Sequence, residues 1–136
     1  MKNGFFRGTE VKMEMKFYKC AHCGKIIAVV KDTRVPVTCC GEKMSEIIPC
    51  SVDAAVEKHV PVYTVEGNVV TVKVGSVLHP MLAEHLIEWV AVKTNFGNQR
   101  KSFVAGDAPE KKFALLDGEV VEEVYAYCNL HGLWKA

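Results

Sequence analysis

Hydrophobic and polar positions alternate in short runs from residue 60 onward. The run from Val69 to Val74 alternates valine with Thr71 and Lys73, which is typical of a strand with one buried face. Glu66-Gly67-Asn68 separates this run from an earlier one, Val60 to Val65, and predicts a hairpin between the two.

Further runs of the same kind follow, and we expect strands over 85–94, 99–104, 112–116 and 119–127. In the first of these, His85, Ile87 and Trp89 fall on one face and the residues between them on the other. Asp117-Gly118 predicts a hairpin that pairs the last two strands. Short strands with turns this frequent indicate an antiparallel β-sandwich, and no long helix is predicted.

The N-terminal part follows a different pattern. Two cysteine pairs, each followed by glycine, lie on either side of a β-rich stretch over 26–37. Glycine suits a tight turn whose N–H groups point at thiolate sulfur. We therefore expect a mainly β protein with three parts: an extension over 1–15, a small four-cysteine module over 16–50 and a sandwich domain over 51–136.

Composition and charge exclude several classes of function. The 136 residues carry a formal net charge of +1, which does not supply the basic surface that nucleic acid phosphates require. The longest aliphatic run, Ile26 to Val30, is too short to cross a bilayer, and residues 1–19 lack the apolar stretch of a secretory signal. We expect a cytoplasmic protein that binds neither nucleic acid nor membrane.

Six cysteines in a chain without an export signal favour metal ligation over disulfides. Cys20 and Cys23 form one local pair, Cys39 and Cys40 form another, and four thiolates can meet on one ion. Zinc and iron both accept four thiolates, so the spacing alone leaves a zinc knuckle as an equal alternative. The directly adjacent pair favours iron, because zinc ribbons usually space both pairs.

A second group of metal-binding residue types lies in the predicted sandwich: His59, His79, His85, Cys128 and His131. A single histidine in a strand is more often a hydrogen-bonded residue than a ligand, but the spacing Cys128-x-x-His131 lets both side chains meet one ion. Four neutral imidazoles and one thiolate would leave ferrous iron with a net positive charge and one vacant octahedral position, which attracts a small anion. A thiolate opposite the vacancy pushes electron density toward whatever binds there.

The motifs around these residues resemble known families. Cys20-x-x-Cys23 with Cys39-Cys40-Gly41-Glu42-Lys43-Met44 resembles the desulforedoxin module, which binds one mononuclear iron. The likeness to superoxide reductases of the neelaredoxin and desulfoferrodoxin families rests on Glu57-Lys58-His59-Val60-Pro61-Val62, Val72-Lys73-Val74-Gly75, His79-Pro80-Met81, Glu84-His85-x-Ile87-Glu88-Trp89 and Tyr127-Cys128-Asn129-Leu130-His131-Gly132-Leu133-Trp134. With the module in front, the chain is similar to desulfoferrodoxin over residues 16–136.

The resemblance implies an immunoglobulin-like sandwich, a homodimer and two mononuclear non-haem iron ions per chain. It implies the one-electron reduction of superoxide to hydrogen peroxide, after which an external rubredoxin-like donor returns the electron. The four-cysteine iron would pass electrons but not bind superoxide, because it is negatively charged and fully coordinated. Such an activity suits an anaerobe or a microaerophile.

The resemblance also assigns roles to single residues. The equatorial ligands of the catalytic iron would be His59, His79, His85 and His131, with Cys128 as the axial ligand. Lys58 would add positive potential at the open position and help to supply protons, and Glu57 would occupy that position once iron is ferric. Without the adjoining ligand, both charges would be interpreted as solvated surface residues.

Two other classes of function stay open at this point. A pure electron carrier needs only the four cysteines of the module and leaves the five sandwich residues unexplained. A zinc-stabilised binding module explains the cysteines but predicts no reducible colour. His22 is expected to be exposed, and Cys50 to be a spare thiol outside both groups.

Overall fold

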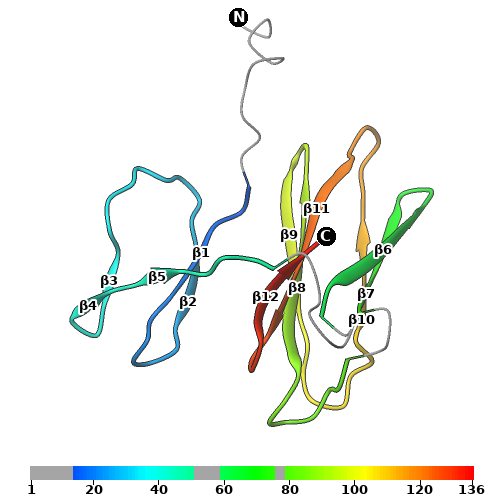
Figure 1. The fold of residues 1–136 in the computed structure, drawn as a ribbon. Coiled ribbons are helices and arrows are strands. Elements are labelled where there is room, and N and C mark those ends of the chain that lie inside the picture. The colour runs from blue at the N-terminus through cyan, green and yellow to red at the C-terminus, as the bar shows by residue number, and fades with distance from the viewer. Residues whose placement is uncertain (1–13, 51–58, 76–78) are drawn as a thin grey trace, which may run out of the picture. The chain divides into compact units, whose positions relative to one another are not determined.

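The computed structural model of the protein describes residues 14–50, 59–75 and 79–136. Contacts between Cα atoms divide the chain into two units, one ending at Glu46 and the other beginning at Ile47. Within the described ranges every regular element is a β-strand, which confirms the mainly β prediction (Figure 1). None of these residues lies in a helix long and apolar enough to span a membrane. The predicted domain boundaries stay predictions.

The first unit consists of short strands in two small antiparallel sheets. One has the order β2-β1-β5, and the other pairs β3 with β4. The strands are β1 (Phe17–Lys19), β2 (Ile26–Ala28), β3 (Thr38–Cys39), β4 (Glu42–Lys43) and β5 (Ser45–Glu46). The predicted β-rich stretch over 26–37 forms a strand only at its start. Each cysteine pair therefore lies at the turn of its own hairpin.

The second unit is an antiparallel sandwich of two sheets, as predicted. The sheets have the orders β10-β7-β6 and β12-β11-β8-β9 (Figure 1). Their strands are β6 (Pro61–Glu66), β7 (Val69–Val74), β8 (Ile87–Thr94), β9 (Gly97–Ser102), β10 (Glu110–Ala114), β11 (Val121–Cys128) and β12 (Gly132–Lys135). The core between the sheets is built from alternating apolar residues, such as Val72 of β7, Phe113 of β10 and Val124 of β11, which are at most 1% exposed.

The hairpin predicted between 60–65 and 69–74 is confirmed by the pairing of β6 with β7. The hairpin predicted at Asp117-Gly118 is wrong, because β10 pairs with β7 whereas β11 pairs with β8 and β12. Gly118, with φ of 81°, does form a turn, but the chain there passes from one sheet to the other. The crossing lets β10 and β11 cover the core from opposite sides.

The strand predicted over 85–94 begins two residues later and contains an irregularity. Tyr127 pairs with Trp89, but the next residue, Cys128, pairs with Ile87, so β8 carries one extra residue. This bulge places Ile87 in the core cluster together with Val90, whereas Trp89 stacks on Tyr127. The predicted sharing of one face by Ile87 and Trp89 is therefore wrong, because a bulge reverses the alternation.

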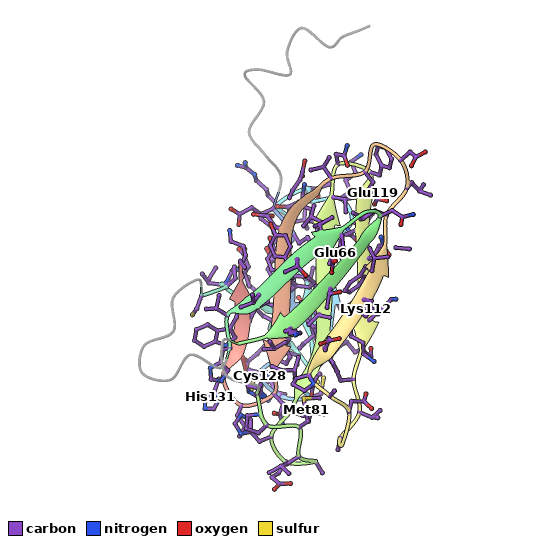
Figure 2. All side chains as sticks on the ribbon, turned by 90° about the vertical axis from the view of Figure 1, so that its right-hand side faces the viewer. Glu66, Met81, Lys112, Glu119, Cys128 and His131 are labelled. Atoms are coloured by element: carbon purple, nitrogen blue, oxygen red, sulfur yellow. The ribbon has the colours of Figure 1, made fainter. Side chains whose placement is uncertain are left out.

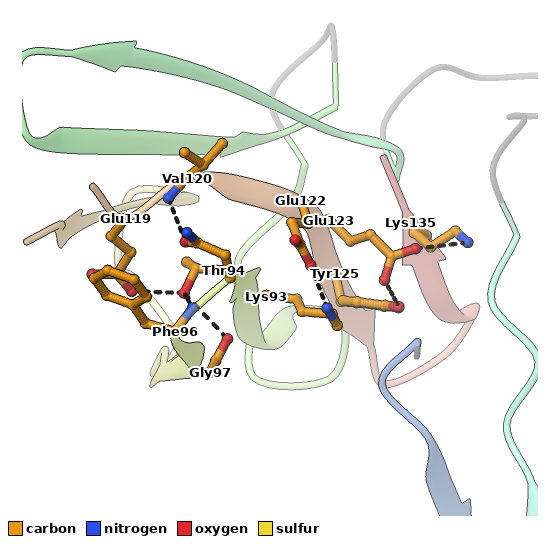
Figure 3. Close-up of polar contacts among 11 residues, drawn as sticks. Lys93, Thr94, Phe96, Gly97, Glu119, Val120, Glu122, Glu123, Tyr125 and Lys135 are labelled. Carbon is orange, nitrogen blue, oxygen red and sulfur yellow. Dashed lines mark hydrogen bonds and ion pairs between the residues drawn. The ribbon is translucent and has the colours of Figure 1, made fainter. Parts of the chain in front are cut away.

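Polar side chains connect β11, the strand that ends at Cys128, to its neighbouring strands. Lys93 of β8 forms an ion pair with Glu122, and Tyr125 donates to Glu123 at 2.8 Å (Figure 3). Lys135 of β12 lies 3.3 Å from Glu123. These contacts link the strand to both of its neighbours and so support the position of its C-terminal end.

Two candidate metal centres

The first centre gathers Cys20, Cys23, Cys39 and Cys40, whose sulfur atoms all lie within 4.8 Å of one another. The Sγ atoms of Cys23 and Cys39 are 3.7 Å apart, and those of Cys39 and Cys40 are 3.9 Å apart. A tetrahedron with metal–sulfur bonds of about 2.3 Å has edges of about 3.8 Å. The four sulfurs therefore have the spacing that one tetrahedral ion requires.

The backbone conformation around these cysteines also brings their sulfur atoms together. Cys40 has a φ of 54°, in the left-handed region that residues other than glycine rarely adopt. That conformation allows two adjacent cysteines to direct their sulfurs toward one point. The N–H groups of Cys23 and His22 donate to Cys20 Sγ at 3.5 and 3.4 Å, and they lower the pKa of Cys20 to about 6.

Cys39 and Cys40 need a nearby cation before both of their thiols can ionise. Hydrogen bonds that the neutral Cys39 thiol makes with the sulfurs of Cys20 and Cys23 raise the pKa of Cys39 to about 12, and the same two neighbours raise the pKa of Cys40. Ionisation of one thiol in this group therefore disfavours ionisation of the next. A bound metal ion removes this opposition, because thiolates are the form that binds metal.

His22 is exposed, as predicted, and it has a partner that the sequence did not reveal. Its Nε2 lies 2.6 Å from Oε1 of Glu42. The contact joins the turn of one cysteine pair to the strand after the other. His22 is not part of the cluster of sulfur atoms.

The second centre lies at one end of the sandwich. Figure 2 shows Cys128, His131 and Met81 at that end, and Glu119 at the opposite end. Cys128 is the last residue of β11, and His131 precedes β12 in the turn that follows. His59 precedes β6, whereas His79 and His85 come from the segment between β7 and β8. The five ligand atoms all lie within 4.8 Å of one another.

The four imidazoles form a closed ring in which each is nearly perpendicular to the next. In the order His59, His79, His85, His131 and back to His59, the ring centroids are 4.7 to 5.0 Å apart and the planes cross at 69 to 83°. Nε2 of His59 and Nδ1 of His131 are 3.0 Å apart. Adjacent ligands at about 2.1 Å from one octahedral metal would be about 3.0 Å apart, so the nitrogens of His59 and His131 have the spacing of two ligands of one ion.

The hydrogen bonds of the ring nitrogens indicate which atom faces the ion. Nδ1 of His79 donates to the carbonyl of Pro80 at 2.6 Å, which leaves Nε2 with its lone pair free. Nε2 of His79 and Nε2 of His85 are buried and have no hydrogen-bond partner among residues 14–50, 59–75 and 79–136. Buried polar atoms are nearly always paired, so these two orphaned nitrogens fit a metal ion.

Burial governs the charges of this centre. It lowers the pKa of His79 to about 4, so this imidazole is neutral at pH 7 and able to bind metal. Cys128 is 0% exposed, and burial raises the pKa of its thiol, although the N–H groups of Leu130 and His131 oppose the change. Its Sγ lies 3.7 Å from Nδ1 of His131, which is itself exposed. Solvent therefore reaches the centre at His131, whereas the thiol is shielded from it.

Two family descriptions match the chain. The one for desulfoferrodoxin matches residues 51–136, and the one for the N-terminal domain of desulfoferrodoxin matches residues 12–47. The chain belongs to the desulfoferrodoxin family. The four-cysteine cluster and the cluster of four histidines and one cysteine correspond to the two iron centres of a desulfoferrodoxin.

Similar proteins span nearly the same length as this chain. A desulfoferrodoxin homolog of Archaeoglobus fulgidus is 44% identical over 94% of this chain and 98% of its own. The desulfoferrodoxin of Nitratidesulfovibrio vulgaris is 42% identical over 90% of this chain and 96% of its own. The crystal structure of the superoxide reductase from Treponema pallidum superposes with a TM-score of 0.80, at 39% identity, over 90% of this chain and 98% of that one.

Some of the residues singled out in the sequence are not in the clusters. Glu57 and Lys58 lie outside the described residues. Cys50 is exposed, belongs to neither cluster, and donates its N–H to the carbonyl of Leu133 at 2.9 Å. Its backbone therefore extends the edge of β12.

Two further residues lie near the second centre: Trp134, which the sequence predicts to pack near the metal, and Asn129, which was assigned no role. Trp134 stacks on His59 with centroids 4.7 Å apart and an interplanar angle of 19°. Asn129, between Cys128 and His131, bonds to the backbone on both sides of His85. The sequence signal for Asn129 was its position between two predicted ligands.

Proposed function

We propose that the cluster of four histidines and Cys128 is the site at which this protein reduces superoxide to hydrogen peroxide. The protein is a superoxide reductase of the desulfoferrodoxin family. The observation that carries the proposal is the ring of four imidazoles over a buried thiol, with two orphaned nitrogens directed into it. Bound ferrous iron would supply one electron and, with a single thiolate, a net positive charge.

The charges of the candidate ligands favour the binding of a small anion at this site. Imidazoles kept neutral add no charge, so the thiolate of Cys128 is the one negative charge among the five ligands. Because Cys128 is buried and His131 is exposed, an anion would reach the site past His131 and not past the thiol. The N–H groups of Leu130 and His131 next to the sulfur stabilise its ionised form.

The reaction balances with one electron and two protons. Superoxide takes one electron and two protons and leaves as hydrogen peroxide, and no dioxygen is formed. A rubredoxin-like protein is proposed as the donor that returns the electron, with the four-cysteine iron as a relay. The ligands of that relay would be Cys20, Cys23, Cys39 and Cys40, whose sulfur spacing supports one tetrahedral ion.

Lys58 and Glu57 are proposed to act at the open position, because they directly precede His59 in the sequence. The ammonium of Lys58 would attract the anion and help to deliver protons through water. The carboxylate of Glu57 would take the open position after the electron has left, since carboxylates suit ferric iron. By family likeness we also propose a homodimer, for which light scattering should give twice the chain mass of 15.1 kDa and not that mass itself.

Replacing Cys128 by serine tests the site. The variant should lose superoxide reduction and the thiolate-to-ferric absorption band of this centre, because the sulfur that supplies both is gone. The band of the four-cysteine centre should stay. Cys50→Ser is the matched control, since Cys50 is a cysteine of the same unit outside both clusters, and it should change neither band nor rate. Undiminished activity in Cys128→Ser would refute the axial assignment.

A further inference from the structure

Asn129 occupies the turn between the two residues that β11 and β12 contribute to the second centre. Cys128 precedes it, and His131 follows two residues later. Its own side chain is not in the cluster of ligand atoms. The side chain instead forms hydrogen bonds with another loop, the one that carries His85.

Three hydrogen bonds from Asn129 surround His85. Oδ1 of Asn129 accepts the N–H of Leu86 at 3.0 Å, and Nδ2 donates to the carbonyl of Glu84 at 3.1 Å. The backbone N–H of Asn129 donates to the carbonyl of Leu86 at 3.2 Å. Both residues that flank His85 are therefore bound to one residue, which is itself the neighbour of Cys128.

The backbone of His85 cannot make this connection itself. Its N–H and its carbonyl are both paired with Leu82, at 3.1 and 2.9 Å. The regular pairing of β8 with β11 ends at Ile87 and Cys128, directly after the bulge. The amide of Asn129 thus continues the link between the two strands beyond the end of their ladder, using one donor and one acceptor as a peptide group would.

We infer that Asn129 is a positioning residue that sets the place of His85 relative to Cys128 in the metal site. This inference rests on the proposed function of that site. Nε2 of His85 is buried and has no hydrogen-bond partner within the part of the chain that the structure describes, so we take the place of this imidazole to be set by its backbone and by a bound ion. Residues that orient ligands in this way affect both the affinity for the metal and the activity.

The chain supplies a matched control with the same three bonds. Oδ1 of Asn95 accepts the N–H of Val120 at 2.7 Å, and Nδ2 donates to the carbonyl of Gly118 at 2.9 Å. The N–H of Asn95 donates to the carbonyl of Val120 at 3.2 Å. These bonds surround Glu119, which lies at the end of the sandwich opposite Cys128 and His131 (Figure 2). The arrangement at Asn129 therefore surrounds a residue of the proposed metal site, whereas the same arrangement at Asn95 surrounds a residue outside it.

The test compares full-length Asn129→Ala and Asn129→Asp with Asn95→Ala and Asn95→Asp. Alanine removes both side-chain bonds, whereas aspartate keeps the acceptor for Leu86 but turns a carboxylate oxygen toward the carbonyl of Glu84. All variants are isolated with iron, and three quantities are measured: iron release to a chelator, the position of the thiolate-to-ferric band from Cys128, and the rate of superoxide consumption. The band of the four-cysteine centre serves as the internal reference.

Both Asn129 variants should release iron from the second centre about 10- to 100-fold faster than the protein itself and lose about 10-fold in rate. Their Cys128 band should shift while the reference band stays. The Asn95 variants should show none of these changes, although they lose the same bonds. If the alanine variants do not fold, the aspartate variants alone are compared, and the same three measurements decide whether Asn129 positions His85.

The inference is overturned if the Asn129 variants match the Asn95 variants in iron release and in band position. Its failure differs from a failure of the proposed function. A protein that binds iron, reduces no superoxide, and still responds to Asn129→Asp in both readouts would refute the function and support the positioning role.

Discussion

Each histidine of the second centre has two ring nitrogens, and its neighbours decide which one is available. Pro80 accepts a hydrogen bond from Nδ1 of His79, whereas in His131 it is Nδ1 that lies 3.0 Å from the nitrogen of His59. The ring thus combines histidines that face the centre through different atoms. Residue type and spacing could not predict this difference, because it depends on contacts made after folding.

The two clusters of candidate ligands could be predicted from the sequence. Cysteine and histidine have few other roles in such patterns, and Cys128-x-x-His131 is a local spacing. The partners of these ligands could not be predicted. Asn129 contacts residues more than 40 positions away, and Glu42 is 20 positions from His22. Such contacts depend on the fold and leave no periodic signal.

Lys58 provides a prediction at this scale. Lys58→Met should lower the rate constant for superoxide consumption by about 10-fold or more at low ionic strength, because a cation near the open position attracts the anion. The difference should shrink as salt is added, since salt screens the attraction. Stopped-flow measurements over a range of ionic strengths test this.

Lys31→Met is the control for Lys58→Met, because it removes the same charge from an exposed position in the first unit. It should leave the rate and its salt dependence unchanged. Equal effects of the two substitutions would mean that net charge, and not Lys58, governs the capture of superoxide.

At the scale of elements, strands were predicted well where they alternate between core and surface. The range of β7 was predicted to the residue, and β6 was predicted within one residue at each end. Pairing was predicted less well. Asp117-Gly118 indicates a turn but not which sheet the next strand joins, and that choice depends on how the two sheets enclose the core. The bulge in β8 likewise results from pairing with β11, not from local sequence.

Phe113 provides the prediction for an element. It is the aromatic residue that β10 inserts into the core at 1% exposure. Phe113→Ala should reduce the free energy of unfolding of the sandwich by about 3 to 5 kcal/mol, because it removes a buried ring and leaves a cavity. Both tryptophans, Trp89 and Trp134, belong to the second unit, so their fluorescence during urea unfolding reports this unit alone.

Leu116→Ala is the control for Phe113→Ala, since Leu116 follows the same strand but is 71% exposed. It should change the free energy of unfolding by no more than about 0.5 kcal/mol. A loss in Phe113→Ala as small as that of the control would contradict the assignment of the core.

At the scale of the whole molecule, each of the two units holds one complete metal centre. The four cysteines all precede Glu46, and the four histidines with Cys128 all follow Ile47. The sequence predicted this organisation because each centre has its own local motifs. The charges of the two centres are predicted to differ as well, since with bound iron four thiolates would make the first centre anionic whereas one thiolate would leave the second cationic.

The central claim is that superoxide is reduced without being oxidised in the same cycle. Hydrogen peroxide formed per superoxide consumed tests it most directly, measured on the fully reduced, iron-loaded protein without oxygen. We expect one peroxide for each superoxide and no dioxygen, because the electron comes from the protein. One peroxide for every two superoxides, accompanied by dioxygen, would contradict the account and identify a dismutase.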